Sequence, residues 1–148
     1  MTGVLELIEV SVDYHRGGQP VHALDSVSLA IGRSESVAVM GPSGCGKSTL
    51  LGVLALTIPP TSGTVLVSGV PAPSSPDGRA RTRNRLLGLI PQSGAVIDHL
   101  SVLANVSLPL EYSRPRTRRR VRHERARQAL ADVGIGWAEA TTPPRLSG

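Results

Sequence analysis

The segment 41–49 contains the residues of this chain best suited to chemistry. Its sequence, Gly-Pro-Ser-Gly-Cys-Gly-Lys-Ser-Thr, matches the pattern G-x-x-x-x-G-K-[ST] in full. Glycines at 41, 44 and 46 allow the backbone to curl so that successive N–H groups point inward at phosphate oxygens. Lys47, the only lysine in the sequence, can reach the β- and γ-phosphates, and the Ser48 hydroxyl can ligate Mg²⁺. We therefore predict a nucleoside triphosphate site here; the alternative is a glycine-rich turn with an incidental lysine.

Gln92 and Cys45 are further polar candidates near this segment. Gln92 follows an apolar run at 87–90 that we interpret as a buried strand, so its amide is expected at the rim where the loop also emerges. There it could contact Mg²⁺ or the attacking water, although a glutamine after a strand can also be an ordinary loop residue. Cys45 occupies a permissive position of the loop, where a simple filler is favoured over a reactive thiol.

A loop of this kind needs a strand before it and a helix after it, and the pattern predicts both. Residues 36–40, Ser-Val-Ala-Val-Met, are almost wholly apolar, which is typical of a strand covered on both faces of a parallel sheet. The helix is expected from Ser48 to about Ile58, ended by two prolines. The predicted elements that follow are a strand at 64–67, a Pro/Ser-rich loop at 71–78, a helical turn near 79–86 and a strand at 87–90.

The two ends of the chain differ in their periodicity. Residues 4–12 alternate apolar and polar side chains and indicate an edge strand with one buried face, joined by a turn at 15–20 to a second strand at 23–31. Beyond Gln92 the spacing of Leu100, Leu103 and Val106 is helical, and residues 116–133 indicate a polar-faced helix. The predicted fold class is α/β: a P-loop NTPase core of N-terminal antiparallel strands plus a parallel βαβ sheet, with the start of an α-helical subdomain. We place the core at residues 1–97 and the partial helical subdomain at residues 98–148.

Composition limits the classes of protein that fit. The chain of 148 residues is 40% hydrophobic and 18% charged, which favours a globular domain over a disordered segment. A single cysteine excludes an internal disulfide framework and a multi-cysteine metal site. No apolar run approaches the roughly 20 residues of a membrane-spanning helix, and the first residues do not resemble a signal peptide. We expect no integral membrane segment and a cytoplasmic location.

The net charge of +5 comes from arginines in the last third of the chain. Residues 114–127 contain eight arginines and one acidic residue, Glu124. A basic helix of this kind could bind nucleic acid or anionic lipid. No aromatic residue interleaves with the arginines to stack on bases, so we favour the solvated face of a helix and expect no nucleic-acid partner.

The motifs, in their order and spacing, resemble the nucleotide-binding domain of ATP-binding cassette (ABC) transporters. Within that superfamily the chain looks most similar to the subfamily that serves macrolide and peptide export or lipoprotein release. The stretches that carry the resemblance are Tyr14, residues 21–29, residues 37–51, the Pro-Thr-Ser-Gly-Thr-Val of residues 60–65, Gln92, residues 100–110 and the Leu-Ser-Gly of residues 146–148.

The resemblance implies a role for each matched residue. Tyr14 would stack on adenine, and Gln92 would ligate Mg²⁺, sense the γ-phosphate and link to the membrane subunit. Ser147 and Gly148 would face the γ-phosphate held by Lys47 of a second copy. The residues implied to bind the phosphates and Mg²⁺ are Gly41, Pro42, Ser43, Gly44, Cys45, Gly46, Lys47, Ser48 and Thr49. The implied cofactors are ATP and Mg²⁺, and the implied partners are a transmembrane permease and a second nucleotide-binding domain, with the chain peripheral to the inner face of the cell membrane.

The chain also departs from the family's pattern. Ser34 stands where glycine is usual, which is expected to strain the turn before residues 36–40, and Pro91 and Ala104 replace a common aromatic and a common glutamate. The sequence stops inside the signature, so we expect the later aspartate–glutamate strand and switch histidine to be missing. The family is an ATP hydrolase coupled to transport. The alternatives for this chain are a non-catalytic nucleotide-binding or regulatory fragment, and a P-loop enzyme of another family such as a small kinase.

Overall fold

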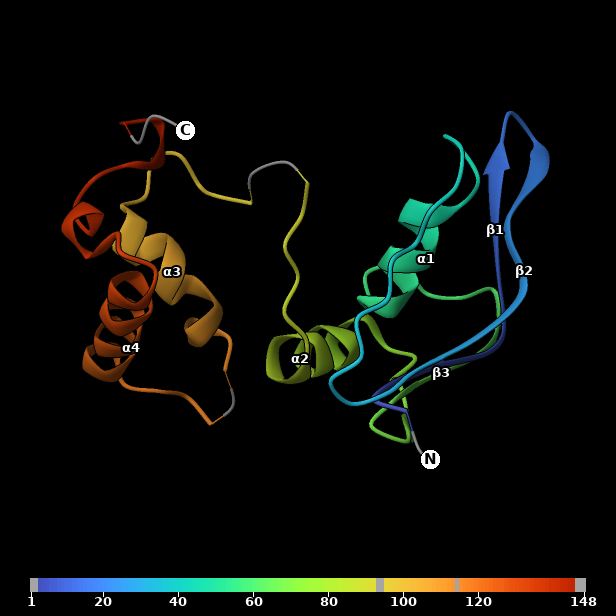
Figure 1. The fold of residues 1–148 in the computed structure, drawn as a ribbon, viewed down its shortest axis with the longest axis horizontal. Helices are drawn as coiled ribbons and strands as arrows, with labels where there is room; N and C mark the ends of the chain where they lie inside the picture. Colours follow the sequence, from blue (N-terminus) through green and yellow to red (C-terminus); the bar gives the residue numbers. More distant parts are fainter. Residues whose placement is uncertain (1–2, 93–94, 114, 146–148) are drawn as a thin grey trace. The chain divides into compact units, whose positions relative to one another are not determined.

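The computed structural model describes residues 3–92, 95–113 and 115–145, and the chain divides into two compact units, Met1–Leu87 and Gly88–Gly148. The first unit begins with a β-hairpin of β1 (Leu5–Arg16) and β2 (Gln19–Ile31) (Figure 1). Gly17 and Gly18 connect the strands with φ of 61° and 81°, the left-handed conformation of both central residues that a tight hairpin turn requires. The predicted turn and second strand are confirmed, and the second strand begins earlier than expected.

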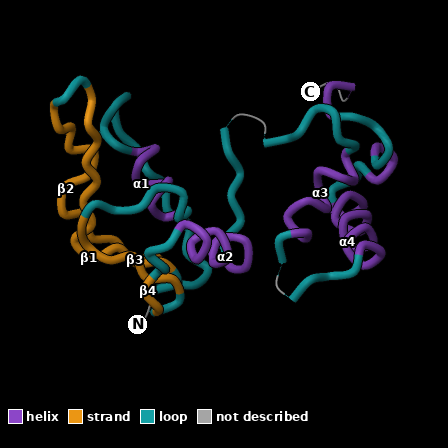
Figure 2. Tube along the Cα trace, turned by 180° about the vertical axis from the view of Figure 1, so that it is seen from behind, coloured by secondary structure: helices purple, strands orange, loops and turns teal. Residues whose placement is uncertain are grey.

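The sheet has the order β2-β1-β3-β4, and all its pairs are antiparallel. β3 (Ser62–Val67) pairs with β1, and the short β4 (Val70–Pro71) pairs with β3 (Figure 2). β1 therefore lies inside the sheet, and its prediction as an edge strand was wrong. Alternating side chains show that one face of a strand is buried, but they do not show whether one or both of its edges are paired.

The two apolar runs predicted to form parallel strands, 36–40 and 87–90, are not strands in the structure. Met40 is 87% exposed and Ile90 is 95% exposed. A strand requires a neighbouring strand to pair with its backbone N–H and C=O groups, and no such neighbour for either run lies among the described residues. These two strand predictions were wrong, and the described sheet contains no parallel pair.

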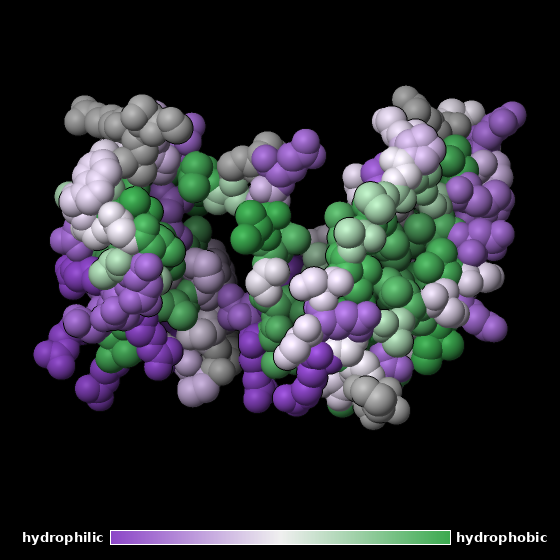
Figure 3. All heavy atoms as spheres, viewed as in Figure 1, coloured by the Kyte–Doolittle hydropathy of each residue, from purple (hydrophilic) through white to green (hydrophobic). Residues whose placement is uncertain are grey.

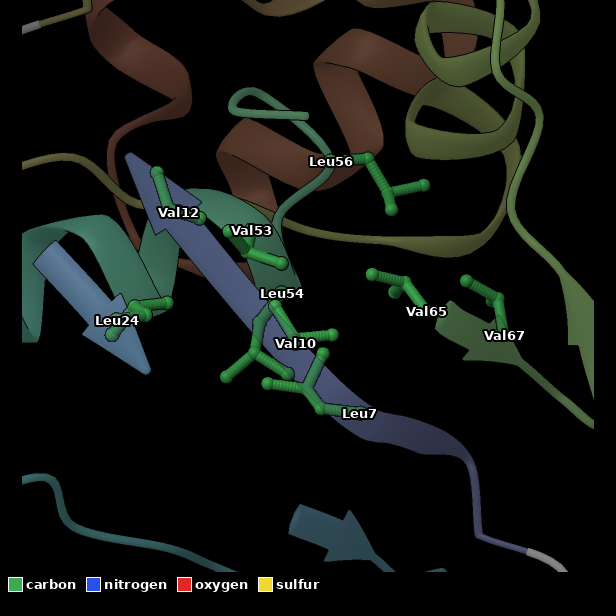
Figure 4. Close-up of a cluster of buried hydrophobic side chains, with 9 residues drawn as sticks. All are labelled: Leu7, Val10, Val12, Leu24, Val53, Leu54, Leu56, Val65 and Val67. Carbon is green, nitrogen blue, oxygen red and sulfur yellow. The ribbon is translucent and has the colours of Figure 1, made fainter. Parts of the chain in front are cut away.

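The core of the first unit lies between the sheet and α1 (Lys47–Leu54). Figure 4 shows the buried cluster, in which Val53 and Leu54 of the helix meet side chains of the strands. Its members are Leu7, Val10, Val12, Leu24, Val53, Leu54, Leu56, Val65 and Val67. This packing against the sheet holds the start of α1, and the loop before it, beside β1 and β2.

α1 ends four residues before the position predicted from the prolines. Leu56 adopts φ 57°, and its N–H donates to the Val53 carbonyl, while the Thr57 N–H donates to the Gly52 carbonyl. This pair of bonds is a Schellman motif with leucine in the position usually taken by glycine. Arg83 of α2 (Pro76–Leu86) donates to the Leu56 carbonyl at 3.0 Å, which ties the second helix to this turn.

The second unit is a pair of helices, α3 (Val102–Glu111) and α4 (Arg119–Asp132), followed by the short 3₁₀ helices η1 (Gly136–Ala138) and η2 (Pro143–Arg145). The Ser101 hydroxyl caps α3 by accepting from the Ala104 N–H. The first N–H groups of α3, on Val102 and Leu103, donate to carbonyls of residues 141 and 139, so the segment after η1 is held at this helix end. Both predicted helices are confirmed. Within the described part of the chain, no helix has the length and apolarity to cross a membrane.

Candidate nucleotide site

The loop at 41–46 takes the curled shape that its glycines predict. Gly41, Gly44 and Gly46 have φ of 153°, 83° and 90°, values that other residues rarely adopt. Gly46 also lies against β2: a Cβ atom at this position would be 2.4 Å from the Ala23 carbonyl oxygen. The glycine therefore permits both the curl and the close approach of the loop to the strand.

The loop runs directly into the N-terminus of α1. Gly46 is the N-cap, it offers no side-chain acceptor, and the first turn carries no acidic residue. The N–H groups at this end and the positive end of the helix dipole are thus left for a negatively charged ligand. Ser48 in this turn is exposed, so its hydroxyl oxygen, a ligand type that Mg²⁺ accepts, is available.

Lys47 folds its side chain back over the loop. Its Nζ donates to the carbonyl oxygens of Gly41, at 2.8 Å, and Pro42, and lies 3.6 Å from the Sγ of Cys45. The positive charge therefore sits within the curl, where the inward N–H groups of a phosphate-binding loop also converge. Carbonyl oxygens that hold an ammonium group can be replaced by phosphate oxygens carrying full charge, which bind it more strongly.

Tyr14 and Thr49 meet at the base of this loop, a contact that the sequence did not predict. Thr49 is 9% exposed, and its Oγ1 lies 3.5 Å from the hydroxyl of Tyr14, whose residue is 40% exposed. The aromatic side chain from β1 is thereby held next to the first turn of α1. The alternation of side chains along β1 predicts the face on which Tyr14 lies, but the contact with Thr49 can be predicted only when the position of α1 on the sheet is known.

The first unit, which holds this cluster, does not include the other predicted site residues. Gln92 is exposed and belongs to the second unit. Its expected place at the end of a strand is not observed, because residues 87–90 form no strand, and its role toward the γ-phosphate stays a prediction. Ser147 and Gly148 lie outside the described residues.

The conformation of Ser34 agrees with the strain expected from a serine in place of glycine. It has φ 57°, the left-handed conformation that favours glycine, in the turn before residues 36–40. A serine in this conformation is strained by the clash of its Cβ with the backbone.

Asn105 is a structural residue that sequence reasoning missed. Its Oδ1 accepts from the Ile97 N–H at 2.7 Å, and its Nδ2 donates to the carbonyls of Ile97, Leu100 and Ser101. One side chain thus fastens residues 97–101 to α3. The available signal was an asparagine within a largely apolar helical stretch, since such a polar group requires local partners when it is shielded from water.

Comparison with known proteins identifies the family. The profile of the ABC transporter family matches residues 24–148. The chain is 35% identical to the uncharacterized ABC transporter ATP-binding protein YvrO of Bacillus subtilis over 98% of its length, and 43% identical to the lipoprotein-releasing system ATP-binding protein LolD of Bordetella pertussis over 91%. It is 38% identical to the macrolide export ATP-binding/permease protein MacB of Salmonella choleraesuis over its whole length.

The fold agrees with that of a solved ATP-binding cassette. The structure matches the dimeric ATP-binding cassette MJ0796, bound to ADP and Pi, with a TM-score of 0.85 and 31% identity over 97% of this chain and 63% of that one. The chain spans 63% of YvrO, 58% of LolD and 23% of MacB. The resemblance inferred from the motifs is confirmed: the chain belongs to the ATP-binding subunit family of ABC transporters.

Proposed function

We propose that this chain is the ATP-binding subunit of an export-type ABC transporter, which binds MgATP and, in the assembled transporter, hydrolyses it to drive transport. The observation that carries the proposal is the loop directly before α1, where three glycines have positive φ and the Lys47 ammonium group donates to the Gly41 carbonyl. The names of two relatives, a lipoprotein-releasing protein and a macrolide exporter, support the export class.

Each part of the loop has a task toward the triphosphate. Lys47 exchanges its carbonyl partners for β- and γ-phosphate oxygens, and the backbone N–H groups of the loop and of the first turn of α1 donate to the remaining oxygens. A bound Mg²⁺, held by the phosphates with Ser48 and Gln92, would neutralise charge on the transferring group. Tyr14 provides the face on which adenine stacks.

The catalytic roles follow from charge and position. In the proposed complex Lys47 stabilises the negative charge that moves onto the phosphate oxygens during hydrolysis. The Gln92 side chain accepts a hydrogen bond from the attacking water and orients it. The same side chain contacts the γ-phosphate and links the nucleotide site to the permease. We assign residues 1–97 to the nucleotide-binding core and residues 98–148 to the partial α-helical subdomain that carries the start of the signature.

The assembly we propose contains two copies that meet head to tail. Ser147 and Gly148 of one copy contact the γ-phosphate of the ATP that Lys47 of the other copy binds. The two copies act beneath a transmembrane permease at the inner face of the membrane. The cassette MJ0796, which is dimeric and shares the fold over 97% of this chain, supports an assembly of two copies.

Titration of the full chain with a fluorescent ATP analogue, with and without Mg²⁺, tests the proposal. Replacing Lys47 by alanine removes a charge-assisted contact of about 1.5–3 kcal/mol, so affinity is expected to fall by about 10- to 100-fold. Arg81→Ala is the matched control, because it removes one positive charge from an exposed site in the same unit. Equal affinity of the Lys47→Ala protein and the control would overturn the proposed site.

Turnover assays separate the remaining alternatives. Release of inorganic phosphate in the presence of the permease supports the transporter subunit. Binding of nucleotide without turnover in that complex indicates a non-catalytic nucleotide-binding or regulatory chain instead. Transfer of phosphate to an acceptor other than water indicates a P-loop enzyme of another kind.

A further inference from the structure

The second unit carries a concentration of arginines whose arrangement the nucleotide site does not explain. Two of the arginines on α4 have structural partners: Arg122 donates to Glu111 at 2.9 Å, and Arg127 donates to Glu139 at 2.8 Å. Both pairs fasten α4 to its neighbours along the chain. These two ion pairs neutralise part of the positive charge of this helix, and the other arginines take no part in them.

The remaining arginines form what we call the basic end of α4. In the part of the chain that the structure describes, these side chains are exposed, and no carboxylate pairs with any of them. The residues are Arg116, Arg118, Arg119, Arg120 and Arg125. Figure 3 shows hydrophilic atoms gathered over the lower end of this unit, where α4 begins.

The position of this charge is unfavourable for the helix itself. Arg118 is the N-cap, Arg119 and Arg120 are the first two helical residues, and the first turn contains no acidic residue and no side-chain cap. Cations at the N-terminus oppose the positive end of the helix dipole, where acidic residues are usual. If this helix face meets only water, the arginines at its N-terminus do not stabilise it. If the surface binds anions, the helix N-terminus and the guanidinium groups attract the same ligand, and the placement is favourable.

Apolar and aromatic side chains accompany the basic end. Tyr112, the C-cap of α3, is 70% exposed, and Val121 in the first turn of α4 is exposed as well. The end of α3 lies beside the start of α4, because Glu111 pairs with Arg122 and the Ser113 hydroxyl lies 3.2 Å from that of Thr117. Exposed tyrosine next to arginines is typical of segments that lie at a lipid headgroup layer.

We propose that the basic end of α4, together with Tyr112, binds the anionic phospholipid headgroups of a membrane surface. Four to eight basic residues on a helix suffice for such binding, and guanidinium groups pair with lipid phosphates in two-point contacts. Single-stranded nucleic acid is the less favoured polyanion, since its binding requires aromatic platforms between the cations and only Tyr112 is present at this end. The surface belongs to the second unit and does not use the phosphate-binding loop.

Sedimentation of the full chain with vesicles tests this proposal. Vesicles of phosphatidylcholine alone are compared with vesicles that contain phosphatidylserine, at low and at physiological salt. Each arginine near an anionic surface contributes about a fivefold gain in binding. The triple variant Arg118→Gln, Arg119→Gln, Arg120→Gln is therefore expected to bind phosphatidylserine vesicles about 100-fold more weakly.

A matched variant with the same net charge separates this surface from a general effect of charge. Arg33, Arg81 and Arg85 are exposed arginines of the first unit, and their replacement by glutamine is expected to lower vesicle binding only slightly. Equal losses in the two triple variants would overturn the proposal. The α4 variant is expected to melt no lower than the wild type, since it removes cations from the positive end of a helix dipole.

Two further outcomes complete the test. If the chain binds a single-stranded RNA oligomer but not anionic vesicles, and the α4 variant loses the RNA, the surface recognises nucleic acid and the proposal is overturned. Lys47→Ala is expected to bind vesicles like the wild type, so failure of nucleotide binding and failure of lipid binding are seen in separate assays.

Discussion

Gly46 joins the phosphate-binding loop to the sheet, and its replacement by alanine tests whether this close approach matters. The Cβ of alanine would lie 2.4 Å from the Ala23 carbonyl oxygen, against ordinary contacts of 3.4 Å or more. Gly44 provides a matched comparison in the same loop. Its φ of 83° is nearly that of Gly46, at 90°, but a Cβ there meets no atom within 4 Å.

The two substitutions separate backbone conformation from contact. The left-handed conformation costs a non-glycine residue about 1–2 kcal/mol, and the lower entropy of alanine in the unfolded chain offsets about 0.5–1 kcal/mol of this. Gly44→Ala is therefore expected to lower the free energy of unfolding by about 1 kcal/mol or less. Gly46→Ala adds a clash with backbone, which costs about 1–3 kcal/mol more, and gives a total loss of about 1–4 kcal/mol.

Urea unfolding followed by circular dichroism measures both free energies. Hydrogen exchange at the amides of β2 (Gln19–Ile31) shows whether the loss in Gly46→Ala is centred on the strand that the new Cβ touches. Affinity for an ATP analogue is expected to fall at least tenfold in Gly46→Ala, because the loop must move away from β2. Equal losses of stability in the two variants would refute the reasoning, since the contact with Ala23 is what distinguishes them.

Substitutions at three other positions test parts of the structure. Ser34→Gly relieves a left-handed serine with φ 57° and is expected to raise the free energy of unfolding by about 0.5–1 kcal/mol, seen as a higher melting temperature; an unchanged or lower value would contradict the strain. Asn105→Ala removes the acceptor of the Ile97 N–H and the side-chain donor of the Leu100 carbonyl, while the carbonyls of Ile97 and Ser101 keep a backbone donor; it is expected to cost about 1–3 kcal/mol, with faster hydrogen exchange at Ile97, and unaltered exchange there would contradict its fastening role. Tyr14→Phe removes only a 3.5 Å contact to Thr49 and is expected to change ATP affinity less than threefold, whereas Tyr14→Ala removes a stacking surface of about 1–3 kcal/mol and is expected to weaken it at least fivefold; equal effects in the titration would exclude stacking as the role of the ring.

The sheet shows where reading the sequence succeeds and where it fails. The glycine pair at 17–18 and the alternating residues around it predicted a hairpin, because turn conformation and strand alternation are both properties of neighbouring residues. The runs 36–40 and 87–90 have the composition of buried strands, yet neither pairs within the described chain. Composition indicates what a segment could bury, while strand formation depends on a partner elsewhere.

The two ends of a helix also differ in how well the sequence predicts them. The start of α1 (Lys47–Leu54) was predicted correctly to within one residue, because the glycines before it and the motif itself mark the boundary. Its end was predicted from Pro59 and Pro60, but a leucine in the left-handed conformation ends the helix earlier. Leu56 is 2% exposed, so burial in the core between sheet and helix stabilises a conformation that its residue type disfavours.

The sequence by itself determined the phosphate-binding loop, the family and the two helices of the second unit. Those features depend on residue type within short contiguous stretches, where glycine conformations, the Lys47 charge and helical spacing are set locally. Only the tertiary structure decided that Tyr14 meets Thr49 and that Gly46 touches β2. Each of these depends on how a helix, strand or loop segment packs on another, and packing is set by the fit of side chains brought together from separate parts of the chain.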